Sequence, residues 1–249
     1  MDTRSLPPEQ CANLIRAARR AVAFTGAGIS TAAGIPDFRG PEGIYATGKY
    51  DAERTFDVEH FRRDPRPFFQ FARDMLAMTG EVEPTFTHRW LARLEADGLL
   101  EGVITQNIDP LHQMAGSQNV IAVHGTFGTA HCMDCRRLFT LAEFLERLGQ
   151  QEIPRCDCGD RGVIKPDVVF FGEPVTQLED AIALAGSCDL MLVLGSSLAV
   201  YPAAILPQLA GGELVVINQG DSGLMPGPRR HFVDSDLDEY TRRVAAALL

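Results

Sequence analysis

The sequence predicts a doubly wound α/β fold, in which helices cover both faces of a parallel β-sheet, together with a smaller cysteine-rich and helical part. Short apolar runs alternate with longer segments of helical periodicity, which is typical of parallel sheets whose strands are buried on both faces. Two stretches, 36–80 and 124–167, interrupt this alternation, and the second of them carries four cysteines.

The elements follow one another in a regular order. An amphipathic helix is predicted over 6–20 and leads into a short buried strand, 21–24. Further apolar runs predict parallel strands at 102–105, 120–123, 168–171, 190–194 and 214–217. Helical periodicity predicts helices over 87–96, 178–186, 202–210 and 237–249.

The two interruptions are expected to form the smaller part of the molecule. Residues 36–80 hold arginines, aromatics and prolines without a clean strand, which predicts a loop followed by a helical insert. Residues 124–167 surround one short helical stretch, 141–148, and predict a cysteine-rich module. The large domain would then comprise residues 1–35, 81–123 and 168–249.

Composition places the chain of 249 residues among folded, soluble proteins, with 45% hydrophobic and 22% charged residues. No apolar run is long enough to span a membrane, and residues 1–8 lack the apolar core of a secretory signal. The net charge of −10 repels phosphate backbones. We therefore expect a cytoplasmic protein with neither nucleic acid nor membrane as partner, and we expect it to be a monomer.

Gly26 and Gly28 follow the first strand directly. A glycine pair at this place lets backbone N–H groups approach a pyrophosphate where the next helix begins. The ordinary dinucleotide fingerprint also requires a small third residue, where Thr31 stands, and an acidic residue at the end of a second strand about 20 residues later. Residues 45–55 hold no such strand. The motif alone leaves a ligand-free strand–helix turn as an alternative.

Four cysteines form two close pairs, Cys132 with Cys135 and Cys156 with Cys158. In a cytosolic chain this pattern favours a closed tetrahedral thiolate site for a structural Zn²⁺, because disulfides are reduced there and four thiolates leave no open position for catalysis. Redox-active thiols are the alternative. The second pair is C-x-C instead of the usual C-x-x-C, and His131 is a possible substitute ligand, as is the aspartate inside that pair, Asp157.

The two remaining cysteines, Cys11 and Cys188, are expected to be plain buried residues.

Polar side chains end two other predicted strands. Gln106, Asn107 and Asp109 follow the strand 102–105, at the edge where open α/β sheets bind ligands, although a loop cap before a proline is the alternative. His124 follows the strand 120–123, where an imidazole can act as a general base near neutral pH. The histidines of helical and tail segments are expected at the surface or in packing: His60, His88, His112 and His231.

Taken in order, these motifs resemble the sirtuins, the NAD-dependent protein deacylases. The resemblance runs from about residue 20 to the C-terminus. It rests on six segments: Gly26 to Gly40, Thr105 to Asp109, His124-Gly125, the paired cysteines, Val168 to Glu173 and Gly195 to Leu198. It implies a Rossmann-like NAD-binding large domain, a small domain made of the zinc module and the helical insert, and a cleft between them where NAD meets an acetylated lysine of a protein.

The resemblance also implies a role for each matching residue. Catalysis would fall to His124 and Asn107. NAD would be bound by Gly26, Ala27, Gly28, Thr31, Asp37, Phe38, Arg39, Gln106, Asn107, Ile108, Asp109, Gly195, Ser196, Ser197, Asn218 and Ser235. The acyl-lysine would contact Val169, Phe171 and Gly172. Structural zinc would be held by Cys132, Cys135, Cys156 and Cys158.

The implied reaction transfers the acyl group to ADP-ribose and releases nicotinamide and free lysine, with His124 taking a proton from the ribose diol. Sirtuins that prefer succinyl-lysine carry a Tyr-x-x-Arg pair, and the matching positions here are Phe69 and Ala72, with Arg73 one place beyond. The expected activity is therefore deacetylation, with tolerance of longer apolar chains and weak desuccinylation. A protein ADP-ribosyltransferase and a non-enzymatic zinc and nucleotide-binding module are the alternatives.

Overall fold

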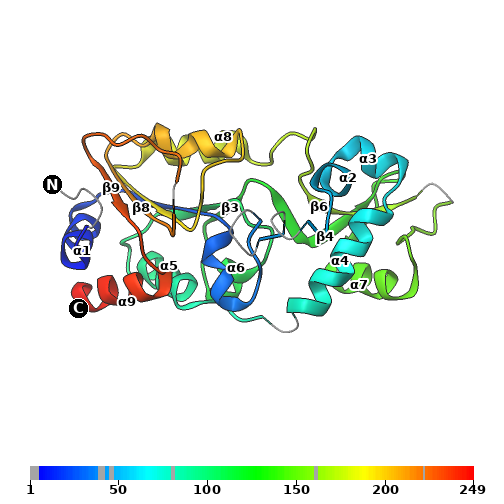
Figure 1. The fold of residues 1–249 in the computed structure, drawn as a ribbon, viewed down its shortest axis with the longest axis horizontal. Helices are drawn as coiled ribbons and strands as arrows, with labels where there is room; N and C mark the ends of the chain where they lie inside the picture. The colour runs from blue at the N-terminus through cyan, green and yellow to red at the C-terminus, as the bar shows by residue number, and fades with distance from the viewer. Residues whose placement is uncertain (1–5, 39–42, 45–47, 80–81, 160–161, 221) are drawn as a thin grey trace.

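The computed structural model describes residues 6–38, 43–44, 48–79, 82–159, 162–220 and 222–249. The molecule is elongated, and its elements gather at two ends (Figure 1). A parallel sheet and its helices form one end, and a small antiparallel sheet with a group of helices forms the other. Within the described residues, no helix combines the length and the apolar character that a membrane crossing requires.

The large sheet has six strands in the order β3-β2-β1-β7-β8-β9, and all neighbouring pairs are parallel. Its strands are β1 (Ala21–Thr25), β2 (Gly102–Thr105), β3 (Val120–Ala122), β7 (Leu190–Leu194), β8 (Glu213–Ile217) and β9 (Arg230–Val233). The strand order reverses between β1 and β7. In sheets of this Rossmann-like type, the crevice outside the carboxyl ends of those two strands is the usual ligand site.

Helices cover both faces of this sheet, as the alternating pattern predicts. On one face lie α1 (Pro8–Ala17), α5 (Phe86–Ala96) and α9 (Leu237–Leu248). On the other lie α8 (Leu178–Ser187) and the 3₁₀ helix η3 (Ala203–Leu209). All five residues of β1 and of β7 are buried, which explains why these strands are almost continuously apolar. A short helix, α6 (Leu111–Ala115), follows β2 and was not predicted.

The smaller end contains a three-stranded antiparallel sheet in the order β5-β4-β6. Its elements are β4 (Gly125–Cys132), β5 (Leu138–Thr140), β6 (Ile164–Val168), α7 (Leu141–Gln150) and the helices of the insert, α2 (Ala52–Phe56), α3 (Val58–Arg63) and α4 (Arg66–Thr79). The helical insert and the helix of the cysteine-rich module are therefore confirmed. The core here is aromatic: the Phe68 and Phe170 rings lie 4.9 Å apart, and Phe61 packs beside both.

One predicted strand of the large sheet is wrong. Residues 168–171 do not pair in that sheet, because β6 ends at Val168 and lies antiparallel to β4 in the small sheet. The apolar run has another cause, since Phe170 fills the aromatic core while Phe171 is 45% exposed. The sixth parallel strand is β9 instead, an edge strand whose Arg230 and His231 gave it the appearance of a polar tail.

The helix expected after the glycine turn is also wrong. Two 3₁₀ turns, η1 (Ala27–Ile29) and η2 (Thr31–Ala33), take its place, and Gly34 ends the second at φ +88°. Downstream, the helix predicted over 202–210 is the 3₁₀ helix η3. Pro207 lies inside it and lacks the N–H that a continuous α-helix needs.

Candidate active site

A cavity of about 480 Å³ opens at the carboxyl ends of β1 and β7, where the large sheet faces the smaller end of the molecule. Its walls come from the turns that follow β1, β2, β7 and β8 and from the segment after β6. The volume falls in the range of small-molecule and cofactor sites. The predicted ligand edge of the sheet is therefore the edge that carries the cavity.

Bare backbone forms the floor of the cavity. The Gly26 N–H donates to Leu194 O at 3.0 Å, and the Gly28 N–H donates to Gly195 O at 2.9 Å. A Cβ atom on Gly28 would lie 2.8 Å from the Gly195 Cα, and Gly195 itself has φ +62°. Only glycine lets the two turns approach so closely. The resulting cradle of backbone groups fits the pyrophosphate of a dinucleotide.

A chain of hydrogen bonds orders the polar side chains after β2. The Asn107 amide donates to Ser30 Oγ at 3.1 Å, and Ser30 Oγ donates to Asp109 Oδ2 at 2.9 Å. The Leu111 N–H donates to the second oxygen, Asp109 Oδ1, at 3.0 Å. Burial raises the pKa of Asp109, and these donors oppose the shift. Asp109 thus accepts the N–H of Leu111, the first residue of α6, and also orders the Ser30 and Asn107 side chains.

Gln106 connects the ends of β2 and β7. Its side-chain amide donates to Ser196 Oγ at 2.7 Å, and the Leu198 N–H donates to the same oxygen at 3.2 Å. Gln106 and Ser196 both line the cavity. The hydrogen bond therefore fixes one wall of the cavity across the strand-order reversal.

His124 lies in the turn between β3 and β4, at the junction of the two sheets. Its Nδ1 is 2.9 Å from the carbonyl oxygen of Gln106. A carbonyl only accepts, so Nδ1 carries the hydrogen and Nε2 is the basic nitrogen. Burial lowers the pKa of His124, and the bond to Gln106 opposes the shift. The imidazole is therefore neutral at neutral pH and suited to general-base catalysis.

The segment after β6 forms the opposite wall. The Val169 N–H donates to His124 O at 2.9 Å, which ties this wall to the histidine. The Phe171 N–H donates to Phe56 O at 2.7 Å, and the Val58 N–H donates to Phe171 O at 3.0 Å. Backbone hydrogen bonds thus hold the segment between the sheet junction and the helical insert.

Most of the predicted site residues line this cavity. They are Gly26, Ala27, Gly28, Asp37, Phe38, Gln106, Asn107, Ile108, His124, Val169, Phe171, Gly172, Gly195, Ser196, Ser197 and Asn218. Three others do not: Thr31 donates to Gly28 O, Asp109 acts through Ser30, and Ser235 donates to Asp236 O. Arg39 lies outside the described residues.

Sequence reasoning missed several lining residues. They are Phe56, Val168, Phe170, Glu173, Val175, Ala199, Val200, Tyr201, Pro202 and Gln219. The run 199–202 follows the turn of β7 directly, so extending the search beyond that turn could have found it. Phe56 comes from the helical insert, and no local pattern separates it from the other phenylalanines of that core.

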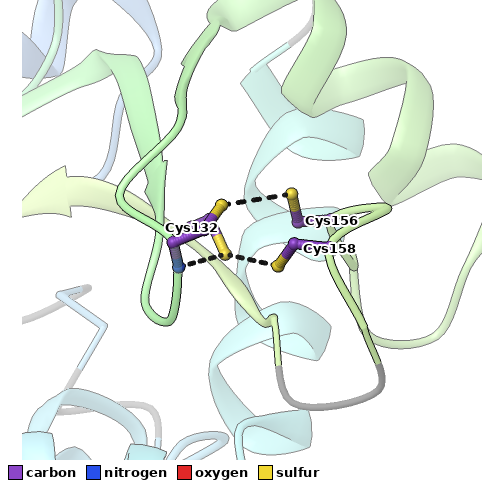
Figure 2. Close-up of side chains that lie close together, drawn as sticks. Cys132, Cys156 and Cys158 are labelled. Atoms are coloured by element: carbon purple, nitrogen blue, oxygen red, sulfur yellow. Dashed lines mark hydrogen bonds between the residues drawn. The ribbon is translucent and has the colours of Figure 1, made fainter.

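The four predicted zinc ligands lie together, two at or just after the end of β4 and two at residues 156–158, and their Sγ atoms are all within 4.8 Å of one another. Cys132 Sγ is 3.6 Å from Cys158 Sγ, and Cys135 Sγ is 3.7 Å from Cys156 Sγ. Figure 2 shows the Cys132, Cys156 and Cys158 side chains directed toward one another. Tetrahedral Zn²⁺ with bonds of about 2.3 Å separates its sulfurs by about 3.8 Å, whereas a disulfide requires about 2.05 Å. The set fits zinc.

The suggested substitute ligands have other partners. His131 Nδ1 is 2.7 Å from Asp167 Oδ1, and Asp157 accepts two hydrogen bonds from Arg147, at 2.8 and 3.1 Å. Arg147 projects from α7 and also donates to Arg155 O. Arg147 therefore stabilises the narrow C-x-C turn. The four thiolates can complete a tetrahedral metal site without His131 or Asp157.

Fold and site together define an α/β protein of the nucleotide-binding, Rossmann-like type, whose smaller end carries four cysteines that fit a metal ion. A family model described as "Sir2 family" matches residues 26–202. An NAD-dependent protein deacetylase of Thermotoga maritima is 43% identical over 238 residues, 93% of this chain and 94% of the relative. The chain belongs to the Sir2 family, and the predicted sirtuin resemblance is confirmed.

Solved structures agree with this assignment. A Sir2 enzyme with a p53 peptide and NAD⁺ superposes with a TM-score of 0.87 at 39% identity, covering 97% of this chain and 98% of that one. A Sir2 protein bound to an acetylated peptide gives 0.86 at 37% identity, covering 98% and 100%. The Rossmann-like sheet with a smaller zinc-binding and helical part is therefore the fold of this family.

Proposed function

We propose that this chain is an NAD-dependent protein lysine deacetylase that uses the cavity at the carboxyl ends of β1 and β7. When bound, NAD supplies ADP-ribose as the acceptor of the acyl group and nicotinamide as the leaving group. The products are free lysine, nicotinamide and O-acetyl-ADP-ribose. The observation that carries the proposal is the neutral His124 at the meeting point of the glycine cradle and the segment after β6.

Each part of the cavity has a task in this proposal. The turns formed by Gly26, Ala27 and Gly28 and by Gly195 and Ser196 would enclose the phosphates. The N–H groups of the three glycines already donate to carbonyls, so the glycines serve by leaving space for the phosphates. Phe38 and Asp37 lie where they can cover the cofactor, and Asn218 lies at the β8 turn for the adenosine side. The proposal keeps Thr31, Arg39, Ser197 and Ser235 as further NAD contacts.

The polar network after β2 would orient the nicotinamide ribose and exclude water. Asn107 and Asp109 share Ser30 as a bridge, so neither side chain can turn away without breaking a buried hydrogen bond. Gln106 is held by Ser196. Ile108 lines the same wall. His124 would accept a proton from the ribose at Nε2, while its Nδ1–H stays on Gln106 O.

The acyl-lysine would enter along Val169, Phe171 and Gly172. Phe56 lies beside them and adds apolar surface. Phe69 and Ala72, the positions that would have to recognise a distal carboxylate, are buried and do not line the cavity. Arg73 donates to three carbonyls at the end of α7, those of Leu148, Gln151 and Glu152. Because these carbonyls hold the Arg73 guanidinium, Arg73 is not placed to bind a distal carboxylate, which supports a preference for acetyl and longer apolar chains over succinyl.

The proposal also divides the chain into a large domain of 1–35, 81–123 and 169–249 and a small domain of 36–80 and 124–168. The boundary expected before residue 168 is moved to follow Val168, because β6 ends there in the small sheet. It includes a monomeric, cytoplasmic protein that acts on acetylated proteins and binds neither nucleic acid nor membrane.

The decisive measurement is nicotinamide release from NAD with and without an acetyl-lysine peptide. The proposal expects release that depends on the peptide, and His124→Ala should lower the rate by about 10²- to 10⁴-fold. His60→Ala, a change of a half-buried histidine on α3 that does not line the cavity, is the matched control and should keep full rate. Release that does not depend on the peptide would instead favour ADP-ribosyl transfer. No release with or without the peptide, together with NAD binding that is unchanged in His124→Ala, would favour a non-enzymatic binding module.

A matched pair of acetyl- and succinyl-lysine peptides tests the acyl preference. We expect a clearly higher kcat/KM for the acetyl peptide. A succinyl preference would mean that another cation reaches the acyl group.

A further inference from the structure

A partly buried ion pair, Lys165 with Glu173, supports the wall that faces the substrate, and Glu173 itself lines the cavity. Lys165 on β6 has a side chain only 11% exposed, and its Nζ is 2.9 Å from Glu173 Oε2. The same ammonium donates to Val168 O at 2.7 Å and lies 4.1 Å from the centre of the Phe170 ring. Burial lowers the pKa of Lys165, and Glu173 opposes the shift. The pair encloses the segment from Val168 to Gly172.

The carboxylate makes a second connection within this segment. Glu173 Oε2 accepts the Phe170 N–H at 2.9 Å, and the Glu173 N–H donates to Phe170 O at 2.9 Å. Lys165 and Glu173 thus hold the backbone at Val168 and at Phe170. The Phe170 ring packs in the aromatic core and also reaches the cavity, and its neighbours Val169 and Phe171 line the cavity on either side of it.

The segment passes this constraint directly to the histidine. The Val169 N–H donates to His124 O. Val169 lies between Val168, whose carbonyl accepts from Lys165, and Phe170, whose N–H donates to Glu173. On the histidine's other side, Gly125 has φ +77°, and a Cβ there would lie 1.9 Å from Asp167 O. Backbone atoms of Asp167 and Val169 are therefore in close contact with the turn that carries His124.

We propose that Lys165 and Glu173 are positioning residues for the deacylation reaction, holding the Val169–Gly172 segment in the shape that receives the acyl-lysine peptide. This inference rests on the proposed function. Lys165 does not line the cavity, so an effect of changing it on substrate binding must pass through the segment or through its partner Glu173, which does line the cavity. A buried pair that lost one partner would leave an uncompensated charge, and the segment would shift to expose it to water.

The test compares Lys165→Met, Glu173→Gln and the double variant, with KM measured separately for acetyl peptide and for NAD. We expect each single variant to raise the peptide KM roughly tenfold, because the segment loses one of its anchors, while the NAD KM changes less than about twofold. The conservative Lys165→Arg keeps a cation and should recover part of the peptide KM. Arg62→Met breaks an exposed ion pair with Glu59 on α3 and is the matched control.

The double variant separates positioning from mere stability. It leaves no unpaired charge, so its Tm should recover relative to the single variants, while its peptide KM stays raised. Recovery of both quantities together would overturn the proposal, as would a folded Lys165→Met enzyme with the parent's peptide KM. If the single variants fail to fold, the Tm and the peptide KM of the double variant still distinguish a positioning role from a role in stability. A parent enzyme without peptide-dependent nicotinamide release would refute the proposed function instead.

Discussion

The two ends of the molecule build their cores in different ways. In the large sheet, β1 and β7 are buried along their full length and helices cover both faces, so apolar burial is sufficient to hold the fold. In the smaller end, a three-stranded sheet packs on an aromatic cluster and ends in four converging thiols. The two ends therefore differ in what holds each of them: the large sheet has buried apolar clusters on both faces, while the smaller end adds to its aromatic core four cysteines that fit a zinc ion.

Loss of zinc should give the largest effect and should act on one end only. Cys156→Ser removes one of four ligands, so we expect zinc content near zero by mass spectrometry and loss of hydrogen-exchange protection in β4, β5 and β6, since structural zinc contributes folding free energy directly. Protection in β1 and β7 should remain.

Cys188→Ser is the control for this change, because Cys188 is a buried cysteine of the large end. It should keep its zinc. Equal loss of protection in both sheets of Cys156→Ser would show that the two ends unfold as one unit, and the comparison drawn above would then fail.

A change at the glycine cradle should have an intermediate effect on the other end. Gly28→Ala places a methyl group 2.8 Å from the Gly195 Cα, so we expect a loss of about 1–3 kcal/mol in the free energy of unfolding and weaker NAD binding by calorimetry. Gly186→Ala, on an open face of α8, should be neutral or slightly stabilising. An unaltered NAD affinity in a folded Gly28→Ala protein would count against the cradle.

Two buried histidines should make the large end sensitive to acid. His88 and His112 have rings 4.7 Å apart, and burial lowers the pKa of His88 to about 4 and that of His112 to about 3. The unfolded chain binds protons from about pH 6.5 downward, while the folded chain does so only near these lower values. Stability should therefore be fully present above pH 6.5 and should fall as the pH drops toward 4.

The measurement is Tm or urea unfolding between pH 7.5 and pH 5. For His88 alone, the linkage amounts to roughly 2 kcal/mol over that interval. His88→Gln should flatten the profile by about this amount. A parallel shift of the whole curve without flattening would exclude the protonation of His88 as the cause.

The sequence predicted best where one local pattern decides the structure. Leu190–Leu194 is apolar throughout and is a central strand, and the cysteine spacing identified the thiolate cluster. Prediction failed where distant contacts decide. Residues 168–171 look like a buried strand, yet Phe170 belongs to an aromatic core formed by the helical insert, and β9 was missed because an edge strand tolerates arginine and histidine.

The prediction of the site also succeeded where a local pattern decides and failed where distant contacts decide. Gly26, Gln106 and His124 follow predicted strands, and parallel strands bring their carboxyl ends together, so their common location in one cavity could be anticipated. Asp109 is linked to Asn107 in the cavity wall through the hydroxyl of Ser30. Ser30 is distant in the sequence, so this link could not be anticipated. Phe56 reaches the cavity from the insert, and only the packing of the two ends reveals it.

The enclosure of Lys165 has a practical side. The chain has two lysines, and the other, Lys49, is half exposed and paired with Asp74. Amine-reactive dyes, crosslinkers and acylating thioesters would therefore find a single accessible lysine side chain, on the helical side of the molecule. The protein therefore has one accessible lysine side chain that could itself become acylated. A fluorophore attached to Lys49 would have one known position in the structure.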